Sequence, residues 1–236
     1  MKNIFALDGT YKEQIKKYDY KDGLLAIALF LIFAVVLALL GLYDKHTETT
    51  IIESRLIGTA ANFLLGIIVI VFLKLRKQSL STIGLKGGRI KLSFILGGCL
   101  AVVLIFFNCV SNILFCGYHF VEIQQIIVNL LFFLSVGFGE EVVFRGYIGT
   151  RIYAFTKNIP IALIVTGLLF LLMHFPYRMA AYDISIISLL TNVRYMADLF
   201  ITHCILSYIY LKTNSIYGSI LPHWMSDLAY GMVTLK

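Results

Sequence analysis

Residues 128–147 read VNLLFFLSVGFGEEVVFRGY, a run of mostly hydrocarbon side chains that ends in two carboxylates and a guanidinium. The apolar part is typical of a helix inside a lipid bilayer, where the backbone polar groups must be bonded within the chain. A charged side chain at the centre of such a helix costs about 2.5 to 3.5 kcal/mol on insertion scales. The stretch therefore predicts a membrane helix, and it marks Glu140, Glu141 and Arg145 as candidates for function.

The composition of the whole chain points the same way. Of its 236 residues, 59% are hydrophobic and 14% charged, and the mean hydropathy is +0.87, far above that of a typical soluble domain. A bilayer core takes about 20 apolar residues to cross. We interpret seven stretches as spans: 24–43, 56–73, 93–117, 123–145, 159–176, 184–211 and 216–234. The sequence predicts an all-α fold, a polytopic transmembrane bundle of about seven spanning helices, within a range of about six to eight.

Basic residues divide unevenly between the connecting segments. Five lysines precede the first span and six lysines and arginines lie between the second and third, whereas the loops of the opposite side carry few. By the positive-inside rule, this asymmetry places the N-terminus in the cytoplasm of a cell-membrane protein. We expect 1–22 to form an interfacial tail, 23–120 the scaffold helices and 121–236 the catalytic helices.

Charge and cysteine content exclude two other classes. The net charge of +7 comes from residues between apolar spans, with no basic stripe on a folded surface, so we expect no nucleic-acid partner. The four cysteines all lie within apolar stretches, where buried free thiols are expected rather than disulfides or metal ligands.

Ionisable residues fall only in the later predicted spans, which suggests a polar site built there on a scaffold of the first three. They are Glu140, Glu141, Arg145, His174, Arg194, Asp198, His203, His223 and Asp227. Glu141 and Arg145 share a helical face at i, i+4 and can form an ion pair, which leaves Glu140 as a free base. The alternative is a structural ion network of all three residues that only joins helices.

Two histidines on other spans complete the candidate site. His174 lies near the end of the fifth span, and His223 stands four residues before Asp227, so that imidazole and carboxyl share a face. Taken singly, each histidine also fits a satisfied core residue, and Asp227 can simply orient His223. The histidines reach the depth of Glu140 only if the fourth helix continues to about residue 155. We therefore predict one long helix through the motif, with Arg151 near the cytoplasmic interface, and a break at Gly146 would argue against the site.

A carboxylate, two imidazoles and water in a shielded cavity suit the hydrolysis of a carbonyl compound. No serine has a nucleophile-elbow pattern and no H-E-x-x-H helix is present. Ser226, three residues after His223, is a poor candidate for a serine–histidine protease.

The order of these motifs resembles the CAAX-protease and bacteriocin-processing (CPBP, or Abi) intramembrane proteases over about residues 125–235. The motifs are Glu140-Glu141-x-x-x-Arg145, Phe170-x-x-x-His174 and His223-x-x-x-Asp227, each on its own span. The resemblance implies an endopeptidase related to the type II CAAX prenyl proteases. It implies that Glu140 activates water, that His174 helps to position it, that His223 and residue 227 stabilise the oxyanion, and that Glu141 and Arg145 shape the site.

The family pattern leaves two questions open: whether the site binds a metal ion, and what Asp227 does. Family members have often been called metalloproteases, and Glu140, His174, His223 and Asp227 offer two nitrogens and two oxygens to zinc. A water activated by Glu140 without metal accounts for the same residues, and we prefer it. The family's last position is often Asn, and an ionised Asp227 cannot donate to an oxyanion. Asp227 must therefore be protonated or act by orienting His223.

The resemblance implies a peptide or membrane-protein substrate, with a role in bacteriocin maturation, self-immunity or CAAX-type processing. Two alternatives stay open: a membrane immunity or scaffold protein without catalysis, and a proton-coupled transporter, since buried Glu, His and Asp also form proton relays. Transporters often carry broken helices and repeats, which this sequence lacks.

Overall fold

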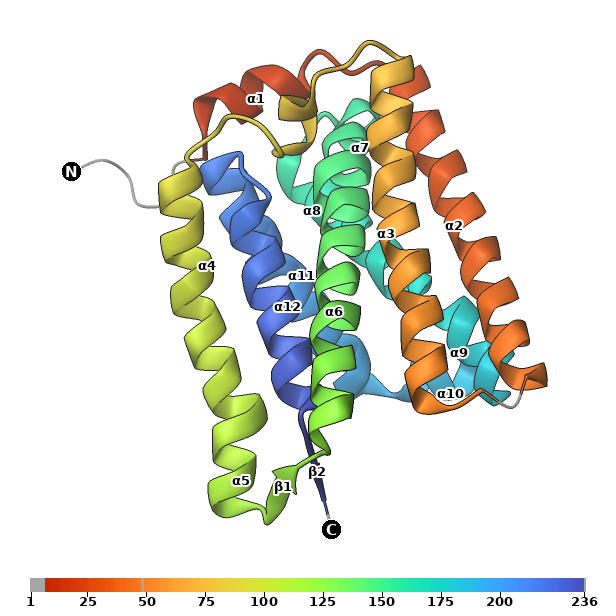
Figure 1. The fold of residues 1–236 in the computed structure, drawn as a ribbon. Coiled ribbons are helices and arrows are strands. Elements are labelled where there is room, and N and C mark those ends of the chain that lie inside the picture. The colour runs from red at the N-terminus through yellow and green to blue at the C-terminus, as the bar shows by residue number, and fades with distance from the viewer. Residues whose placement is uncertain (1–6, 48, 236) are drawn as a thin grey trace.

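The computed structural model describes residues 7–47 and 49–235. The predicted all-α helical bundle is confirmed (Figure 1). Its helices are α1 (Gly9–Ile15), α2 (Tyr20–His46), α3 (Ile51–Leu75), α4 (Ile90–Ile105), α5 (Ser111–Phe115), α6 (Ile123–Glu140), α7 (Gly149–Thr156), α8 (Ile159–Met173), α9 (Phe175–Tyr182), α10 (Ile186–Thr191), α11 (Val193–Thr213) and α12 (Tyr217–Gly231). A 3-10 turn, η1 (Leu80–Ile83), and two π-helical segments, η2 (Phe106–Val110) and η3 (Glu141–Ile148), complete the helical elements.

Five helices are long and apolar enough to cross a membrane, among the described residues. They cover Tyr20–His46, Ile51–Leu75, Ile90–Phe115, Ile123–Thr156 and Ile159–Tyr182. Their outward faces carry large apolar side chains, for example Ile32, Val35 and Leu39 of α2, each 58 to 60% exposed. Such a surface is suited to lipid contact, and the chain is a multi-pass membrane protein. The count of seven stays a prediction, because α11 and α12 are not among the five.

The helix ends follow local chemistry. Asp19 caps α2 and Thr50 caps α3, each in a reciprocal capping box with the residue three positions on, Asp22 and Glu53. The two capping boxes begin α2 at residue 20 and α3 at residue 51. Helix α3 therefore starts earlier than the predicted second span, 56–73, because Thr50 caps it. Arg55, just before that predicted span, lies inside α3, which corrects the prediction that the first three spans are free of charge.

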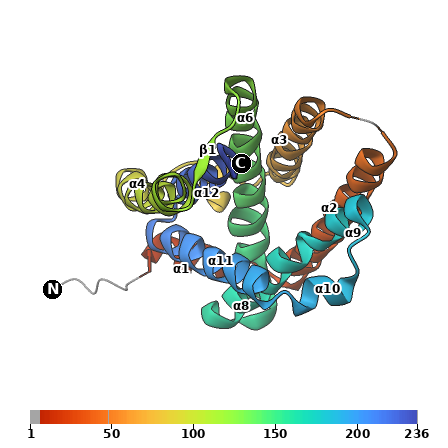
Figure 2. The same ribbon diagram turned by 90° about the horizontal axis from the view of Figure 1, so that it is seen from below.

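Helix α6 lies at the centre of the bundle, between α3 and α12 (Figure 2). Small residues bring α12 close to α4: a Cβ on Gly97 would lie 2.6 Å from the carbonyl oxygen of Gly218. On the opposite side of α6, a Cβ on Gly139 would lie 2.5 Å from the carbonyl oxygen of Asn62 in α3. Such close backbone contacts are typical of membrane helices, which pack through small residues.

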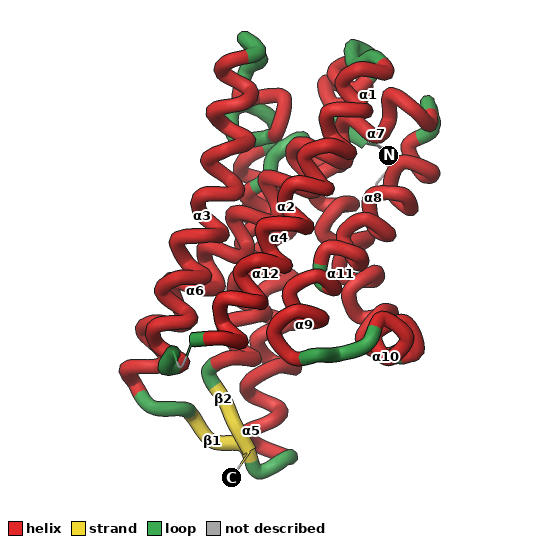
Figure 3. The backbone as a smooth tube through the Cα atoms, turned by 90° about the vertical axis from the view of Figure 1, so that its right-hand side faces the viewer, coloured by secondary structure: helices red, strands yellow, loops and turns green. Residues whose placement is uncertain are grey.

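A two-stranded antiparallel sheet, β1 (Tyr118–Phe120) with β2 (Val233–Leu235), closes one end of the bundle (Figure 3). The strands join the α5–α6 connection to the segment after α12, and α1 lies at the opposite end (Figure 1). The sequence analysis did not predict this pair. Each strand is three residues long, too short for an alternating pattern to stand out.

One expectation about buried groups needs correction. The four cysteines are free, as predicted, but only Cys109 is buried, whereas Cys99 and Cys116 are exposed on the surface of the bundle. Arg151 is fully buried within the bundle, and its guanidinium lies over the rings of Tyr18 and Tyr147. Its place near the cytoplasmic interface stays a prediction. The segment before α2 covers this end of the bundle and encloses the arginine.

Candidate active site

The helix that carries the motif is continuous. It runs from Ile123 to Thr156 as a single span, so the prediction of one long helix without a break at Gly146 is confirmed. The motif itself lies in η3, where the helix widens into a π-helical segment whose eight residues are all buried. Such segments are frequent at functional sites because they change the direction of side chains relative to an α-helix. No feature of the sequence indicated this widening.

A buried ion network forms one side of the site. The Glu141 Oε1 to Arg145 Nη1 distance is 2.8 Å, and both side chains are at most 1% exposed. His223 of α12 donates from Nδ1 to the same Oε1 at 2.7 Å. The predicted Glu141–Arg145 pair is therefore formed, and it does more than neutralise charge. Glu141 orients His223, a role that the sequence analysis considered for Asp227.

Two partly exposed carboxylates form the other side. His223 Nε2 lies 3.5 Å from Oδ2 of Asp227 and 3.8 Å from Oε2 of Glu140, so α6 and α12 both contribute acids to one nitrogen. Their side chains are 24% exposed for Glu140 and 35% for Asp227. His223 thus joins the two sides of the arrangement: its Nδ1 is bonded to Glu141, and its Nε2 faces Glu140 and Asp227.

His174 lies beside this cluster without a direct bond to it. It stands between α8 and α9, just before Phe175 and Pro176, and its Nδ1 is 2.8 Å from the carbonyl oxygen of Phe170. Because a carbonyl only accepts, Nδ1 carries the proton and Nε2 of the neutral ring is an acceptor. Within the described residues, no hydrogen bond or ion pair joins His174 to Glu140, His223 or Asp227. The ring of His174 contacts the ring of Phe170, and the Phe170 ring lies 4.4 Å from the Arg145 guanidinium. Phe170 therefore connects His174 to the ion network of Glu141, Arg145 and His223.

Two residues near the site were missed by the sequence analysis. Tyr195 of α11 packs its ring 6.5 Å from that of His174, lies under the Arg178 guanidinium at 4.4 Å and interacts electrostatically with Glu140. Its buried hydroxyl has no hydrogen-bond partner in the described part of the protein. Arg55 of α3 interacts electrostatically with Asp227. Neither residue stands three or four positions from a motif residue, so helical spacing could not have identified them. The charge of Arg55 was the one sequence feature that pointed to either.

The remaining polar candidates lie outside the cluster. His203 is buried and bonds to Ser207 at 3.3 Å. Arg194 and Asp198 are exposed, and although they are spaced i, i+4 they form no ion pair within the described residues. Ser226 accepts a hydrogen bond from Asn108 at 2.8 Å, which turns it toward η2 rather than toward His223.

A zinc site remains a prediction. The described residues contain no group of three or more His, Cys, Asp or Glu side chains arranged to hold a metal ion. His174 in particular is bonded to a backbone carbonyl and not to the other three candidate ligands. We therefore derive no chemical step through a metal.

Comparison with known proteins adds one independent finding. Residues 122–229 match the model of a protein family described as type II CAAX prenyl endopeptidase Rce1-like. The match begins one residue before α6 and ends within α12, so it includes every predicted site residue. Comparisons with curated proteins and with solved structures found no significant match. The resemblance to the CAAX-type intramembrane proteases is confirmed.

Proposed function

We propose that this chain, whose residues 122–229 match the family model described as type II CAAX prenyl endopeptidase Rce1-like, hydrolyses peptide bonds with Glu140 as general base. One observation carries the proposal: Glu140 and Asp227 converge on Nε2 of His223, while Nδ1 is bonded to Glu141. A carboxylate and an oriented imidazole that face a common space supply the groups that hydrolysis of an amide needs.

Glu140 is the base because it is the carboxylate that Arg145 does not pair with. Its Oε2 has no hydrogen-bond partner among the described residues, and its side chain is partly exposed. It can accept a proton from a water molecule as the oxygen of that water attacks the scissile carbonyl. The protonated Glu140 can then give this proton to the leaving amine nitrogen as the C–N bond breaks. Glu141, fully buried and paired twice, is not free for this step.

His174 orients the attacking water. Its Nδ1 proton is donated to the Phe170 carbonyl, so Nε2 accepts the second O–H of a water that donates its first to Glu140. A water that donates to two fixed acceptors has its remaining lone pair held in one direction, toward the scissile carbonyl. Such positioning of the nucleophile lowers the barrier to attack.

His223 stabilises the oxyanion. Its Nδ1 proton is held by Glu141, so a protonated ring presents Nε2–H toward the space that Glu140 and Asp227 border. The negative charge of Glu141 favours that protonated form. Asp227 lies close enough to Nε2 to hold the imidazolium in place, and it needs no proton of its own for this role.

The test is cleavage by the purified full chain in lipid nanodiscs. The probes are a farnesylated peptide ending in a C-a-a-X sequence, the same peptide without farnesyl, and a Gly-rich leader peptide for a maturation role. Glu140→Gln and His174→Ala should each lower cleavage, by about 10²- to 10⁴-fold for loss of the base. Glu122→Gln, an exposed carboxylate just before α6, is the matched control. Cleavage unchanged in both site variants would overturn the proposal.

Metal dependence is decided in the same assay. A chelator that leaves cleavage intact supports a glutamate-activated water. Loss of cleavage on chelation, with recovery on adding zinc, would instead assign zinc to the donor set of Glu140, His174, His223 and Asp227.

A further inference from the structure

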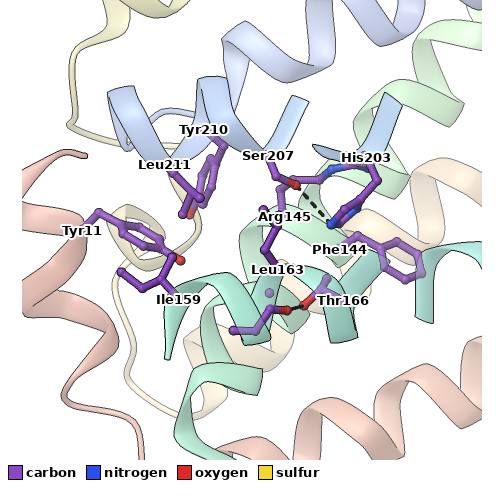
Figure 4. Close-up of a pocket in the computed structure, with 12 residues that line it drawn as sticks. Tyr11, Phe144, Arg145, Ile159, Leu163, Thr166, His203, Ser207, Tyr210 and Leu211 are labelled. Atoms are coloured by element: carbon purple, nitrogen blue, oxygen red, sulfur yellow. Dashed lines mark hydrogen bonds between the residues drawn. The ribbon is translucent and has the colours of Figure 1, made fainter. Parts of the chain in front are cut away.

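A second polar space borders Arg145, and His223 is not among the residues that line it. It is a cavity of about 30 Å³ between η3, α8 and α11, and the N-terminal helix α1 borders it (Figure 4). We name it the polar chamber, after the lining residues that carry polar groups: Tyr11, Arg145, Thr166, His203, Ser207 and Tyr210. None of the proposed catalytic steps uses this space.

The polar chamber is lined by donors that the protein leaves unpaired. Arg145 is within ion-pair distance of Glu141 through Nη1, but its Nε and Nη2 have no hydrogen-bond partner among the described residues. The hydroxyl of Tyr210 is likewise buried without a partner. A buried donor without an acceptor destabilises the fold, and a charged donor does so more strongly than a neutral one. These donors therefore require an acceptor that the described side chains do not supply.

The size and charge of the chamber select the ligand. A water molecule needs about 10 to 15 Å³ of such space and two to four polar partners, so the chamber suits one or two waters. It is too small for an organic ligand. A bound anion is disfavoured because the charge of Arg145 is already balanced by Glu141.

The N-terminal helix closes the chamber. Tyr11 is 4% exposed and packs edge-on against Tyr210, with 5.8 Å between ring centroids. Burial raises the pKa of the Tyr11 phenol, so this hydroxyl stays neutral and can donate. Helix α1 is tied down on both sides: the Asp8 backbone N–H donates to Leu211 at 3.0 Å and the Gln14 amide donates to Thr82 at 2.7 Å.

We propose that the polar chamber is an internal water site that hydrates Arg145 and that Tyr11 of α1 closes. This site stands independently of the protease function, because it rests on the unpaired donors and the cavity alone. It gives α1 a role in supporting the ion pair that orients His223.

An apolar groove in the same chain supplies the control. It measures about 440 Å³, lies between α2 and α3, and is lined by twelve apolar residues that include the buried Phe33 and the outward-facing Ile32. Apolar surroundings hold no ordered water. Phe144 in the chamber and Phe33 in the groove are of one residue type and are 2% and 1% exposed.

The first experiment is radiolytic hydroxyl-radical footprinting of the full chain in nanodiscs, since bound water is a local source of radicals. We expect Tyr210 and Phe144 to be modified several-fold faster than Phe33, despite equal burial. Equal rates at Phe144, Tyr210 and Phe33 would overturn the proposal.

Two pairs of variants locate the water and its closure. Ser207→Val adds apolar volume to the chamber and should lower modification of Tyr210 to the rate of Phe33, whereas Ser207→Ala should not.

Tyr11→Ala should speed exchange of ¹⁸O-water into the modified Tyr210 several-fold, whereas Tyr11→Phe, which keeps the ring, should leave it unchanged. If Tyr11→Ala fails to fold, Tyr11→Val is the substitute. Exchange at the wild-type rate in the opened variant would refute closure by α1.

Discussion

The two nitrogens of His223 face different environments. Nδ1 meets the Glu141–Arg145 pair, which is excluded from solvent, at 2.7 Å. Nε2 meets Glu140 at 3.8 Å and Asp227 at 3.5 Å, distances beyond normal hydrogen-bond length, and both of these carboxylates are partly exposed. On the first side Nδ1 has a close, buried acceptor, which can hold the ring in place. The second side has unfilled hydrogen-bonding capacity, which is where a substrate and a water can bind.

Under the proposed function, the side of His223 that faces Glu141 contributes to stability and the side that faces Glu140 and Asp227 contributes to chemistry. Removing one partner of a buried ion pair leaves an uncompensated charge, at a cost of about 3 to 5 kcal/mol. A partly exposed carboxylate without a close partner loses little when its charge is removed. Variants on the two sides of His223 should therefore separate folding from activity.

The largest effect on stability is expected from Arg145→Met. It leaves Glu141 charged and buried, and should lower the free energy of unfolding by about 3 to 5 kcal/mol. Thermal unfolding in detergent measures the change, with the exposed Arg194→Met as control. Glu140→Gln should stay within about 0.5 kcal/mol of wild type. Equal destabilisation by Arg145→Met and Glu140→Gln would remove the distinction between the two sides.

The double variant Glu141→Leu with Arg145→Met sharpens the comparison. Removing both charges should recover stability relative to Arg145→Met, with a coupling of about 0.5 to 3 kcal/mol. Cleavage should not return, because Nδ1 of His223 has lost its acceptor. A double variant that cleaves like wild type would show that Glu141 does not orient this ring.

Asp227→Asn tests the reactive side with a smaller change. The amide keeps the shape and can donate a hydrogen bond, and Glu141 still holds His223. We expect cleavage to fall by less than about tenfold, equivalent to about 1.4 kcal/mol in the barrier. A much larger loss in kcat would mean that the negative charge of Asp227 takes part in the reaction.

Ser226→Ala should have the smallest effect. It removes the acceptor of one partly buried hydrogen bond from Asn108 and should cost about 1 kcal/mol of stability. Cleavage should be unchanged after correction for the folded fraction. A complete loss of cleavage in a folded Ser226→Ala protein would revive a serine nucleophile.

Much of the helical framework could be predicted from the sequence. The long helix through Gly146 follows from hydropathy and from the depth at which Glu140 must meet the histidines, and the Glu141–Arg145 pair follows from i, i+4 spacing. These predictions rest on helix geometry, which is local. Non-local contacts were harder: nothing near Arg55 or Tyr195 in the chain indicates that they lie close to Asp227 and Glu140.

The sequence by itself determined a helical membrane protein and the residues too costly to place in lipid without a purpose. Hydropathy and helical periodicity are properties of neighbouring residues, so they can be read along the chain. Only the tertiary structure decided that Glu141, and not Asp227, bonds to Nδ1 of His223, and that α1 covers the chamber that borders Arg145. The first contact joins residues 82 positions apart, and the packing of Tyr11 on Tyr210 joins residues 199 positions apart. Both depend on the packing of helices, which no local pattern encodes.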